Sequence, residues 1–277
     1  MGLFVEEARE KRMTQSLIVV EQREAIFEIR LNRPEKRNAI TFEMWQEIER
    51  AADQAERAEG VRAVIVRGEG SCFSAGIDLA SLMDVAQGFG ENWKSRMRSI
   101  TARYQAVVNR LERLEIPVIA LLHGHCLGLG LELALACDIR LAAEGAKLGL
   151  PETLRGLVPD VGGTTRLTRL TGPAVAKELI FTGRSLDAGE ALRLGLVNRV
   201  VPEGDDLLQV GKALAEEIAR AAPLAVGAAK RIIDGLFDSD RGLQIEGWAQ
   251  SQLIASQDLM EGIQAFFEKR PARFTGK

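Results

Sequence analysis

The sequence predicts an α/β fold whose core is a mainly parallel sheet. Short apolar runs typical of strands alternate with segments of helical periodicity from residue 17 to residue 142, and this order favours parallel pairing through connecting helices. Beyond residue 162 nearly every segment has helical periodicity. With 277 residues, 46% hydrophobic and 27% charged, the chain suits one large globular domain or a domain with an appendage.

The first half of the chain contains the elements of this sheet. Thr41 is expected to cap a helix and Gly60 to end it, because apolar residues recur at helical spacing between them. Pro34 and its polar neighbours end the strand before that helix. In chain order the expected elements are strands 17–20 and 25–31, the helix between Thr41 and Gly60, strand 61–66, helix 92–113, strand 118–122, helix 128–137 and strand 139–142.

Helices dominate the chain after Gly162, and we expect them to pack against the core or against a neighbouring subunit. The expected helices are residues 164–170, 174–181, 188–194, 207–219, 224–237 and 241–267. Residues 196–201 predict one further strand. Because no repeat or clear linker divides the chain, one α/β domain with a helical tail is favoured over two independent domains.

The composition disfavours nucleic-acid and membrane partners. The formal net charge is −3 and the basic residues form no stripe, so we expect no nucleic-acid partner. No apolar run reaches the roughly 18 residues that a membrane-spanning helix needs. The cysteines, Cys72, Cys126 and Cys137, are few and odd in number, and the polar residues 1–15 lack the apolar core of a secretory signal. We therefore expect a cytoplasmic protein.

Two glutamates stand in surroundings that are unusual for a carboxylate. Glu132 ends the glycine-rich and otherwise mostly apolar run 124–132, and Glu152 follows the apolar run 148–151. A carboxylate placed among apolar residues loses hydration, and its pKa rises. If both groups converge on one pocket, they would supply the acid and the base that proton-transfer chemistry needs.

Two turns that follow strands are candidates for binding an oxyanion. Residues 73–79 follow the strand 61–66, and residues 124–132 follow the strand 118–122. Such turns expose backbone N–H groups that bind anions or a developing oxyanion. Taken alone, residues 73–79 are better interpreted as a tight turn in which Asp78 caps a helix. The glycines of residues 124–132 match neither the dinucleotide fingerprint nor a phosphate loop.

A third acid, Asp160, lies in the loop that follows Glu152. Isolated acidic loop residues are usually solvated, and that interpretation stays open for both carboxylates. We expect no metal centre, because His123, His125 and Cys126 lack ligand-spaced partners elsewhere and are better interpreted as core or wall residues. Having only these two histidines, and no Gly-x-Ser-x-Gly elbow, also argues against a serine-hydrolase triad.

Short motifs spread over almost the whole chain occur in a highly specific order and spacing, although each is modest alone. They are residues 31–34, 38–40, 73–79, 124–132, 136–140, 150–152, 162–164, 261–262 and 265–270. In this order they resemble the crotonase family, also called the enoyl-CoA hydratase/isomerase superfamily.

This resemblance implies a fold of stacked ββα units with a C-terminal helical trimerisation region, and hence a homotrimer or a hexamer made as a dimer of trimers. The implied regions are a flexible N-terminal extension at 1–16, a ββα core with the active site at 17–205, and the helical region at 206–277. The implied substrate is an acyl-CoA thioester. Coenzyme A is then part of the substrate, and no other cofactor is expected.

The resemblance also assigns roles to residues at matching positions. The backbone N–H groups of Ile77 and Leu129 would form the oxyanion hole for the thioester oxygen. Leu129 stands where the family usually has glycine, which would narrow the pocket. The positions expected to contact the substrate are Lys36, Arg37, Ala39, Ala75, Asp78 and Leu79, with Lys269 reaching the coenzyme phosphates from a neighbouring subunit.

The same resemblance leaves two reactions open. Syn addition of water to a trans-2-enoyl-CoA, giving a 3-hydroxyacyl-CoA, is the leading hypothesis, because Glu132 and Glu152 match both glutamates of the hydratases. Asp160 favours the alternative, since delta(3,5)-delta(2,4)-dienoyl-CoA isomerases and some enoyl-CoA isomerases have an acid there. Those isomerases, however, tend to carry aspartate at the position of Glu132. A non-enzymatic RNA-binding relative is a further alternative, which the net charge of −3 and the retained catalytic positions disfavour.

Overall fold

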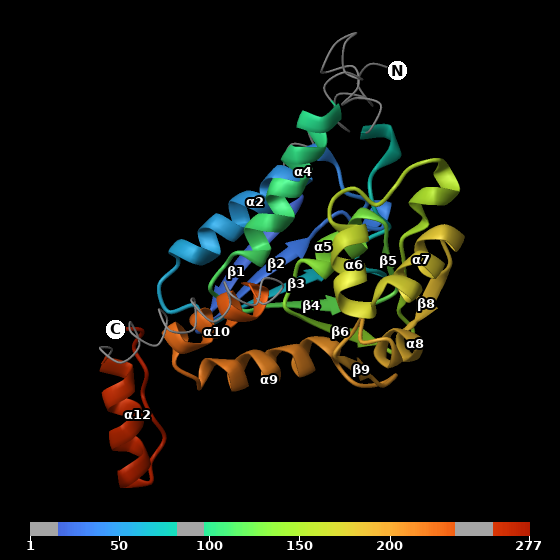
Figure 1. Ribbon diagram of the computed structural model, residues 1–277. Coiled ribbons are helices and arrows are strands. Elements are labelled where there is room, and N and C mark those ends of the chain that lie inside the picture. The colour runs from blue at the N-terminus through green and yellow to red at the C-terminus, as the bar shows by residue number, and fades with distance from the viewer. Residues whose placement is uncertain (1–15, 82–96, 236–256) are drawn as a thin grey trace.

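The structure is a computed structural model that describes residues 16–81, 97–235 and 257–277 (Figure 1). Its main sheet contains, in spatial order, β1 (Ile18–Arg23), β2 (Ile26–Leu31), β3 (Ala63–Gly68), β4 (Val118–Leu122), β6 (Ile139–Ala143) and β9 (Arg199–Val201). Only β1 and β2 pair antiparallel, and the other neighbours in this sheet pair in parallel. The expected α/β core with mainly parallel pairing is therefore confirmed.

A second, smaller sheet carries part of the candidate site. It contains β5 (His125–Leu127), β7 (Lys147–Gly149) and β8 (Ser185–Asp187), with β7 in the middle. The sequence patterns indicated none of these strands, because so few residues cannot display an alternation of apolar and polar side chains. The strand expected at 196–201 is also corrected, since β9 begins only at Arg199 and the residues before it join no ladder.

Helices cover both faces of the main sheet. On one face, α2 (Phe42–Arg57) and α4 (Met97–Glu112) share a core cluster with Val64 of β3. On the other face, α9 (Leu207–Ala219) packs against Ile65 of the same strand. Successive residues of a strand point to opposite faces, so a strand covered on both sides is apolar throughout.

Helix α2 begins where the sequence predicts. The Thr41 hydroxyl accepts a hydrogen bond from the Met44 N–H at 3.1 Å, which satisfies one of the unpaired donors of the first helical turn. The helix buries one apolar stripe, made of Met44, Trp45, Ile48, Ala51, Ala52 and Ala55. This stripe fixes α2 to the sheet shortly after residues 36–39, which are expected to contact the substrate.

The remaining helices surround the small sheet or follow the main one. They are the 3-10 helix η1 (Pro34–Lys36), α5 (Leu129–Leu135), the 3-10 helix η3 (Pro151–Arg155), α6 (Gly163–Thr171), α7 (Pro173–Thr182), α8 (Ala188–Arg193), α10 (Pro223–Gly235) and α12 (Gln257–Glu268). The helix expected at 241–267 overlaps α12 only near its end, and its earlier part lies outside the described residues. Residues 92–96 of the helix expected at 92–113 lie outside them as well.

The last helix, α12, stands away from the sheet (Figure 1). The C-terminal tail returns along it, and the Gln257 N–H donates to the Lys277 carbonyl at 2.7 Å. Arg62 Nη2 donates to the Phe274 carbonyl at 2.9 Å and ties this tail to the body of the protein. None of the helices in the described ranges is long and apolar enough to cross a membrane. The boundaries at residues 16 and 205 and the trimerisation role stay predictions.

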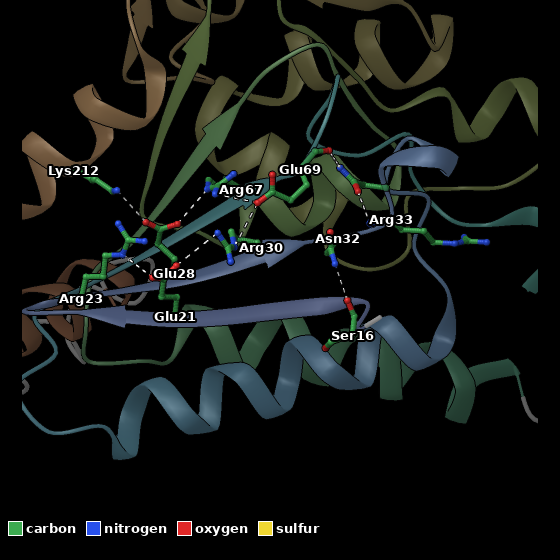
Figure 2. Close-up of polar contacts among 11 residues, drawn as sticks. Ser16, Glu21, Arg23, Glu28, Arg30, Asn32, Arg33, Arg67, Glu69 and Lys212 are labelled. Atoms are coloured by element: carbon green, nitrogen blue, oxygen red, sulfur yellow. Dashed lines mark hydrogen bonds and ion pairs between the residues drawn. The ribbon is translucent and has the colours of Figure 1, made fainter. Parts of the chain in front are cut away.

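A charged network lies between the sheet and α9 (Figure 2). Glu28 of β2 is buried, with 4% of its surface exposed. Arg67 Nε lies 3.2 Å from its Oε2, and Lys212 Nζ of α9 lies 3.4 Å from its Oε1. Arg67 also pairs with Glu69 at 3.1 Å. A buried carboxylate is tolerated when it is paired in this way, so the network holds α9 to the sheet.

We expect Arg67→Met to lower the free energy of unfolding by about 1.5–3 kcal/mol, because buried Glu28 loses a charged hydrogen bond. Urea unfolding followed by circular dichroism measures the loss. Arg184→Gln is the control, since Arg184 pairs with Glu178 and Glu190 at the surface, where solvent weakens such pairs, so a smaller loss is expected. Equal losses in both variants would contradict the role of the network.

Candidate active site

The loop after β3 runs beside β5, and this pairing brings the two expected oxyanion donors together. The Ser74 N–H donates to the His125 carbonyl at 2.9 Å, and the Leu127 N–H donates to the Ser74 carbonyl at 3.0 Å. These bonds form an isolated parallel bridge between the loop and the strand. Ile77 and Leu129 follow the two bonded segments, so their backbones lie side by side.

Gly76 shows how closely the two segments approach. Its φ is 99°, and a Cβ built there would lie 2.9 Å from the Leu127 carbonyl oxygen and 3.6 Å from the Leu129 nitrogen. Any side chain at this position would be strained and would fill the space beside the donors. The close approach of the two loops therefore requires glycine here.

The N–H groups of Ile77 and Leu129 are available as donors. The groups on either side of Ile77 are paired, since the Ile40 N–H donates to the Gly76 carbonyl at 2.8 Å and the Asp78 N–H donates to the Ile40 carbonyl at 2.9 Å. Leu129 is the first residue of α5, where an N–H has no helical partner. Within the described ranges neither N–H donates to an acceptor. This arrangement meets the requirement of an oxyanion hole.

Glu132 projects from α5 with 2% of its surface exposed. Its Oε1 accepts hydrogen bonds from the N–H groups of Val161 at 2.8 Å and Gly163 at 2.9 Å. Burial is the main cause that raises the pKa of Glu132 to about 8. The charges of Glu152 and Asp160 act in the same direction, and the two N–H groups oppose them.

Glu152 belongs to η3 and lies against the turn that precedes α5. Its Oε1 lies 3.0 Å from the point where a Cβ of residue 128 would be, so Gly128 leaves room for the carboxyl group. Its Oε2 is buried and has no hydrogen-bond partner among the residues described. Burial raises the pKa of Glu152. A buried acceptor without a partner marks a point where a reacting proton can be received.

Asp160 lies at the exposed side of the same site. Thr101 Oγ1 of α4 donates to its Oδ2 at 2.9 Å, and Gln105 Nε2 donates to its carbonyl oxygen at 2.6 Å. Its negative charge contributes to the raised pKa values of Glu132 and Glu152. The three acids expected from the sequence are therefore brought together, from α5, η3 and the loop before α6. The run 101–105 of α4 also resembles the dienoyl-CoA isomerases, but the sequence did not predict that Thr101 and Gln105 hold Asp160.

Asp78 is engaged by its own chain. Its Oδ1 accepts from the N–H groups of Ala80 at 2.9 Å and Ser81 at 3.2 Å, and its Oδ2 forms an ion pair with Arg33. Burial raises the pKa of Asp78, but the Arg33 bond and the N–H bonds outweigh burial and leave this pKa below its usual value. The helix-capping interpretation is therefore observed, and the carboxylate caps the helical turn that begins at Leu79, whose side chain is largely exposed.

The loop expected to lie along the coenzyme is held by Asn38. This residue is fully buried, and its Nδ2 donates to the carbonyl groups of Glu69 and Cys72, both at 2.8 Å. The Ala75 N–H donates to the Arg37 carbonyl at 2.9 Å. Hydrogen bonds therefore join the loop of residues 36–39 to the loop that carries Ile77.

The other expected substrate contacts lie in two places. Lys36, Arg37 and Ala75 are exposed and Ala39 is half-buried, so this surface is accessible beside the oxyanion donors. Lys269 follows α12, which stands away from them in Figure 1. A single chain does not bring Lys269 to the site, and its expected role requires a neighbouring subunit.

Sequence reasoning missed Ser74 as a residue that shapes the site. Its hydroxyl donates to the Asn38 carbonyl at 2.8 Å and accepts from the Gly76 N–H at 3.1 Å. A Cβ at Gly130 would lie 2.7 Å from the Ser74 Cβ, so α5 rests directly on this side chain. The run of small residues at 74–76 was the only sign of this close packing in the sequence.

The histidines take different positions. His123 is half-buried and its Nε2 bonds the Gly70 carbonyl at 3.1 Å, while burial lowers its pKa. His125 is exposed, which corrects its interpretation as a core or wall residue, whereas Cys126 is buried. Among the described residues no group of three or more His, Cys, Asp or Glu side chains is placed to hold a metal ion.

Comparisons with known proteins agree on one family. The family model described as enoyl-CoA hydratase/isomerase matches residues 21–277. A human protein named enoyl-CoA hydratase domain-containing protein 2, mitochondrial, is 42% identical over 260 residues, which cover 92% of this chain and 87% of that protein. A probable enoyl-CoA hydratase of Mycobacterium tuberculosis is 38% identical over 265 residues, which cover 95% of this chain and 99% of that protein.

A solved structure extends this agreement to three dimensions. The crystal structure of an enoyl-CoA hydratase from Bacillus anthracis matches with a TM-score of 0.86 at 38% sequence identity, covering 95% of this chain and all of that one. The family-model match at residues 21–277 spans every segment of the candidate site. The chain belongs to the enoyl-CoA hydratase/isomerase family, the crotonase superfamily.

Proposed function

We propose that the protein is an enoyl-CoA hydratase, which adds water in syn fashion to a trans-2-enoyl-CoA and forms a 3-hydroxyacyl-CoA. One observation carries the proposal: two carboxyl groups with raised pKa values, buried Glu132 and half-buried Glu152, lie beside the free N–H groups of Ile77 and Leu129. Relatives named enoyl-CoA hydratase, at 38% identity over most of the chain, support it.

The carboxyl pair supplies the proton transfers of this reaction. One carboxylate removes a proton from water as the oxygen adds to C3, and the other carboxyl, which is neutral, gives a proton to C2. Two interacting acids titrate as a pair, so we assign the shared proton to the pair of Glu132 and Glu152. The unpaired Oε2 of Glu152 can accept a hydrogen bond from the reacting water.

The backbone donors stabilise the charge that develops during this addition. Attack at C3 places enolate-like negative charge on the thioester oxygen. The N–H groups of Ile77 and Leu129 are held in place before the substrate arrives, because their loops are bonded to each other. Preorganised donors of this kind are each worth on the order of 2.7–4 kcal/mol in the transition state.

The remaining features belong to the same proposal. The coenzyme would lie along the loop of Lys36, Arg37 and Ala39, with its phosphates met by Lys269 of a neighbouring subunit. A homotrimer, or a hexamer of two trimers, would bring Lys269 there, and the separation of α12 from the sheet supports this assembly. No cofactor besides the coenzyme A of the substrate takes part. The cytoplasmic location stays a prediction.

A second candidate, dienoyl-CoA or enoyl-CoA isomerisation, is favoured by one observation. Asp160 is fixed by Thr101, and its charge reaches both Glu132 and Glu152. A third acid beside the pair could carry a proton to or from a more distant carbon of the acyl chain. In that reaction no water is added, so the two candidates differ in their products.

We expect the purified protein to hydrate crotonyl-CoA, with loss of the enone absorbance as the measurement. Glu152→Gln should lower kcat by at least about 1000-fold, because the pair loses one of its two titrating groups. Glu178→Gln is the control, since Glu178 is exposed and pairs with Arg184 at the surface. No turnover of crotonyl-CoA by the unaltered protein, with rapid conversion of a 3,5-dienoyl-CoA, would overturn the hydratase proposal.

Asp160→Asn separates the two reactions. The amide keeps the size of the side chain, so the loop and its contact with Thr101 remain. We expect the rate of crotonyl-CoA hydration to change less than about threefold, because Glu132 and Glu152 are retained. A loss of about 100-fold or more in the rate of hydration would show that Asp160 takes part in hydration and would contradict this expectation.

We expect kcat/KM for hydration to fall on both sides of an optimum. Raising the pH past about 8 removes the proton that the folded protein holds at Glu132, and the acid of the pair is lost. Lowering the pH protonates the second carboxyl, and because burial also raises the pKa of Glu152, this loss begins above 4.5. A profile that is flat from about pH 5 to pH 9 would contradict a shared proton on the pair.

A further inference from the structure

Arg166 of α6 is a buried cation next to the loop that holds Glu132. Only 8% of its surface is exposed. Its Nη2 donates to Asn109 Oδ1 at 2.8 Å and lies 2.7 Å from Glu112 Oε2, while its Nη1 donates to the Val161 carbonyl at 3.4 Å. The guanidinium therefore connects α4 to the backbone of this loop.

The two sides of the Val161–Gly163 loop contact different residues. Its inner side presents the N–H groups of Val161 and Gly163 to Glu132 Oε1. Its outer side meets Arg166, and a Cβ at Gly162 would lie 1.8 Å from the Nη1 atom. Because one peptide segment joins both sides, a shift of the guanidinium changes the position of the donors to Glu132.

One face of α4 supports this arrangement along its length. Thr101, Gln105, Asn109 and Glu112 recur at the spacing of three and four residues that places side chains on one helix face. The first two hold Asp160, and the last two hold Arg166. A groove of about 520 Å³ lies between α4 and the Val161–Gly163 loop, beside Arg166. The loop therefore has room to move if the contacts of Arg166 with α4 are removed.

We propose that Arg166, braced by Asn109 and Glu112 of α4, is a positioning residue that holds the Val161–Gly163 loop against Glu132. The fork of the guanidinium, rather than its charge alone, carries this role, because three acceptors on two elements must be met at once. The effect of Arg166 on the rate of catalysis rests on the proposed function. The effect of Arg166 on the pKa of the Glu132 carboxyl is independent of that function.

A titration of Glu132 tests the positioning role without a substrate. The carbon-13 signal of the Glu132 carboxyl, identified by its absence in Glu132→Gln, reports its pKa as the pH is changed. In the unaltered protein this pKa is about 8, with the Val161 and Gly163 N–H groups lowering it. When these donors move away, the charged form loses their support and the pKa rises.

Arg166→Lys keeps the positive charge but loses the fork, so the pKa of Glu132 should rise by about one unit. Asn109→Leu keeps Arg166 itself and removes one anchor, so a smaller rise is expected, and it serves if the lysine variant does not fold. Arg110→Gln is the matched control, because Arg110 of α4 pairs with Asp53 instead of the loop. It should leave the Glu132 titration unchanged.

Steady-state kinetics then show whether the displacement of the Val161–Gly163 loop lowers the rate of the reaction. In Arg166→Lys the kcat for crotonyl-CoA should fall about tenfold while KM stays within about threefold, since no substrate contact is removed. An unshifted Glu132 titration in Arg166→Lys, or an equal shift in Arg110→Gln, would overturn the positioning role. A shifted titration in a protein that does not turn over crotonyl-CoA would support that role and reject the hydratase proposal.

Discussion

The site depends on one short backbone contact, the bridge between the loop after β3 and β5. Ser74 exchanges hydrogen bonds with His125 and Leu127, and this exchange ties the main sheet to the smaller one. This bridge fixes the positions of the N–H groups that face the thioester oxygen in the proposed reaction. Because Gly76 has no side chain, the loop and the segment after β5 can approach until the N–H groups of Ile77 and Leu129 lie side by side.

Burial of the acids is a second constraint, and it works against stability. A rise in the pKa of Glu132 from 4.5 to about 8 means that its charged form is disfavoured by on the order of 5 kcal/mol in the folded state. The folded protein then keeps a proton that the unfolded chain releases, so this group's contribution to stability is lost as the pH rises from 4.5 to about 8. The Val161–Gly163 donors offset part of this cost, and Arg166 with α4 holds those donors.

Much of the fold could be predicted from the sequence, and the exceptions share a cause. Helix α2 shows a clear period and bounding turn residues, and strand β4 shows an unbroken apolar run, so both were predicted within a few residues. The short strands β5, β7 and β8 show no period, because their partners in the small sheet stabilise them rather than their own side chains. The supporting contacts of Thr101 and Gln105 with Asp160 were hidden for a similar reason, since they join residues more than 50 positions apart.

The sequence by itself determined which chemistry is available. It placed Glu132 and Glu152 among apolar residues, put glycines where two loops must approach, and carried the ordered motifs of the family. Only the tertiary structure decided how these groups act. It showed that Asp78 is occupied by Arg33, that Glu152 has an unpaired oxygen, and that Arg166 reaches the loop behind Glu132. The solvent exposure of a carboxyl group, its ion pairs and its hydrogen bonds depend on distances between segments. The linear order of residues does not contain those distances.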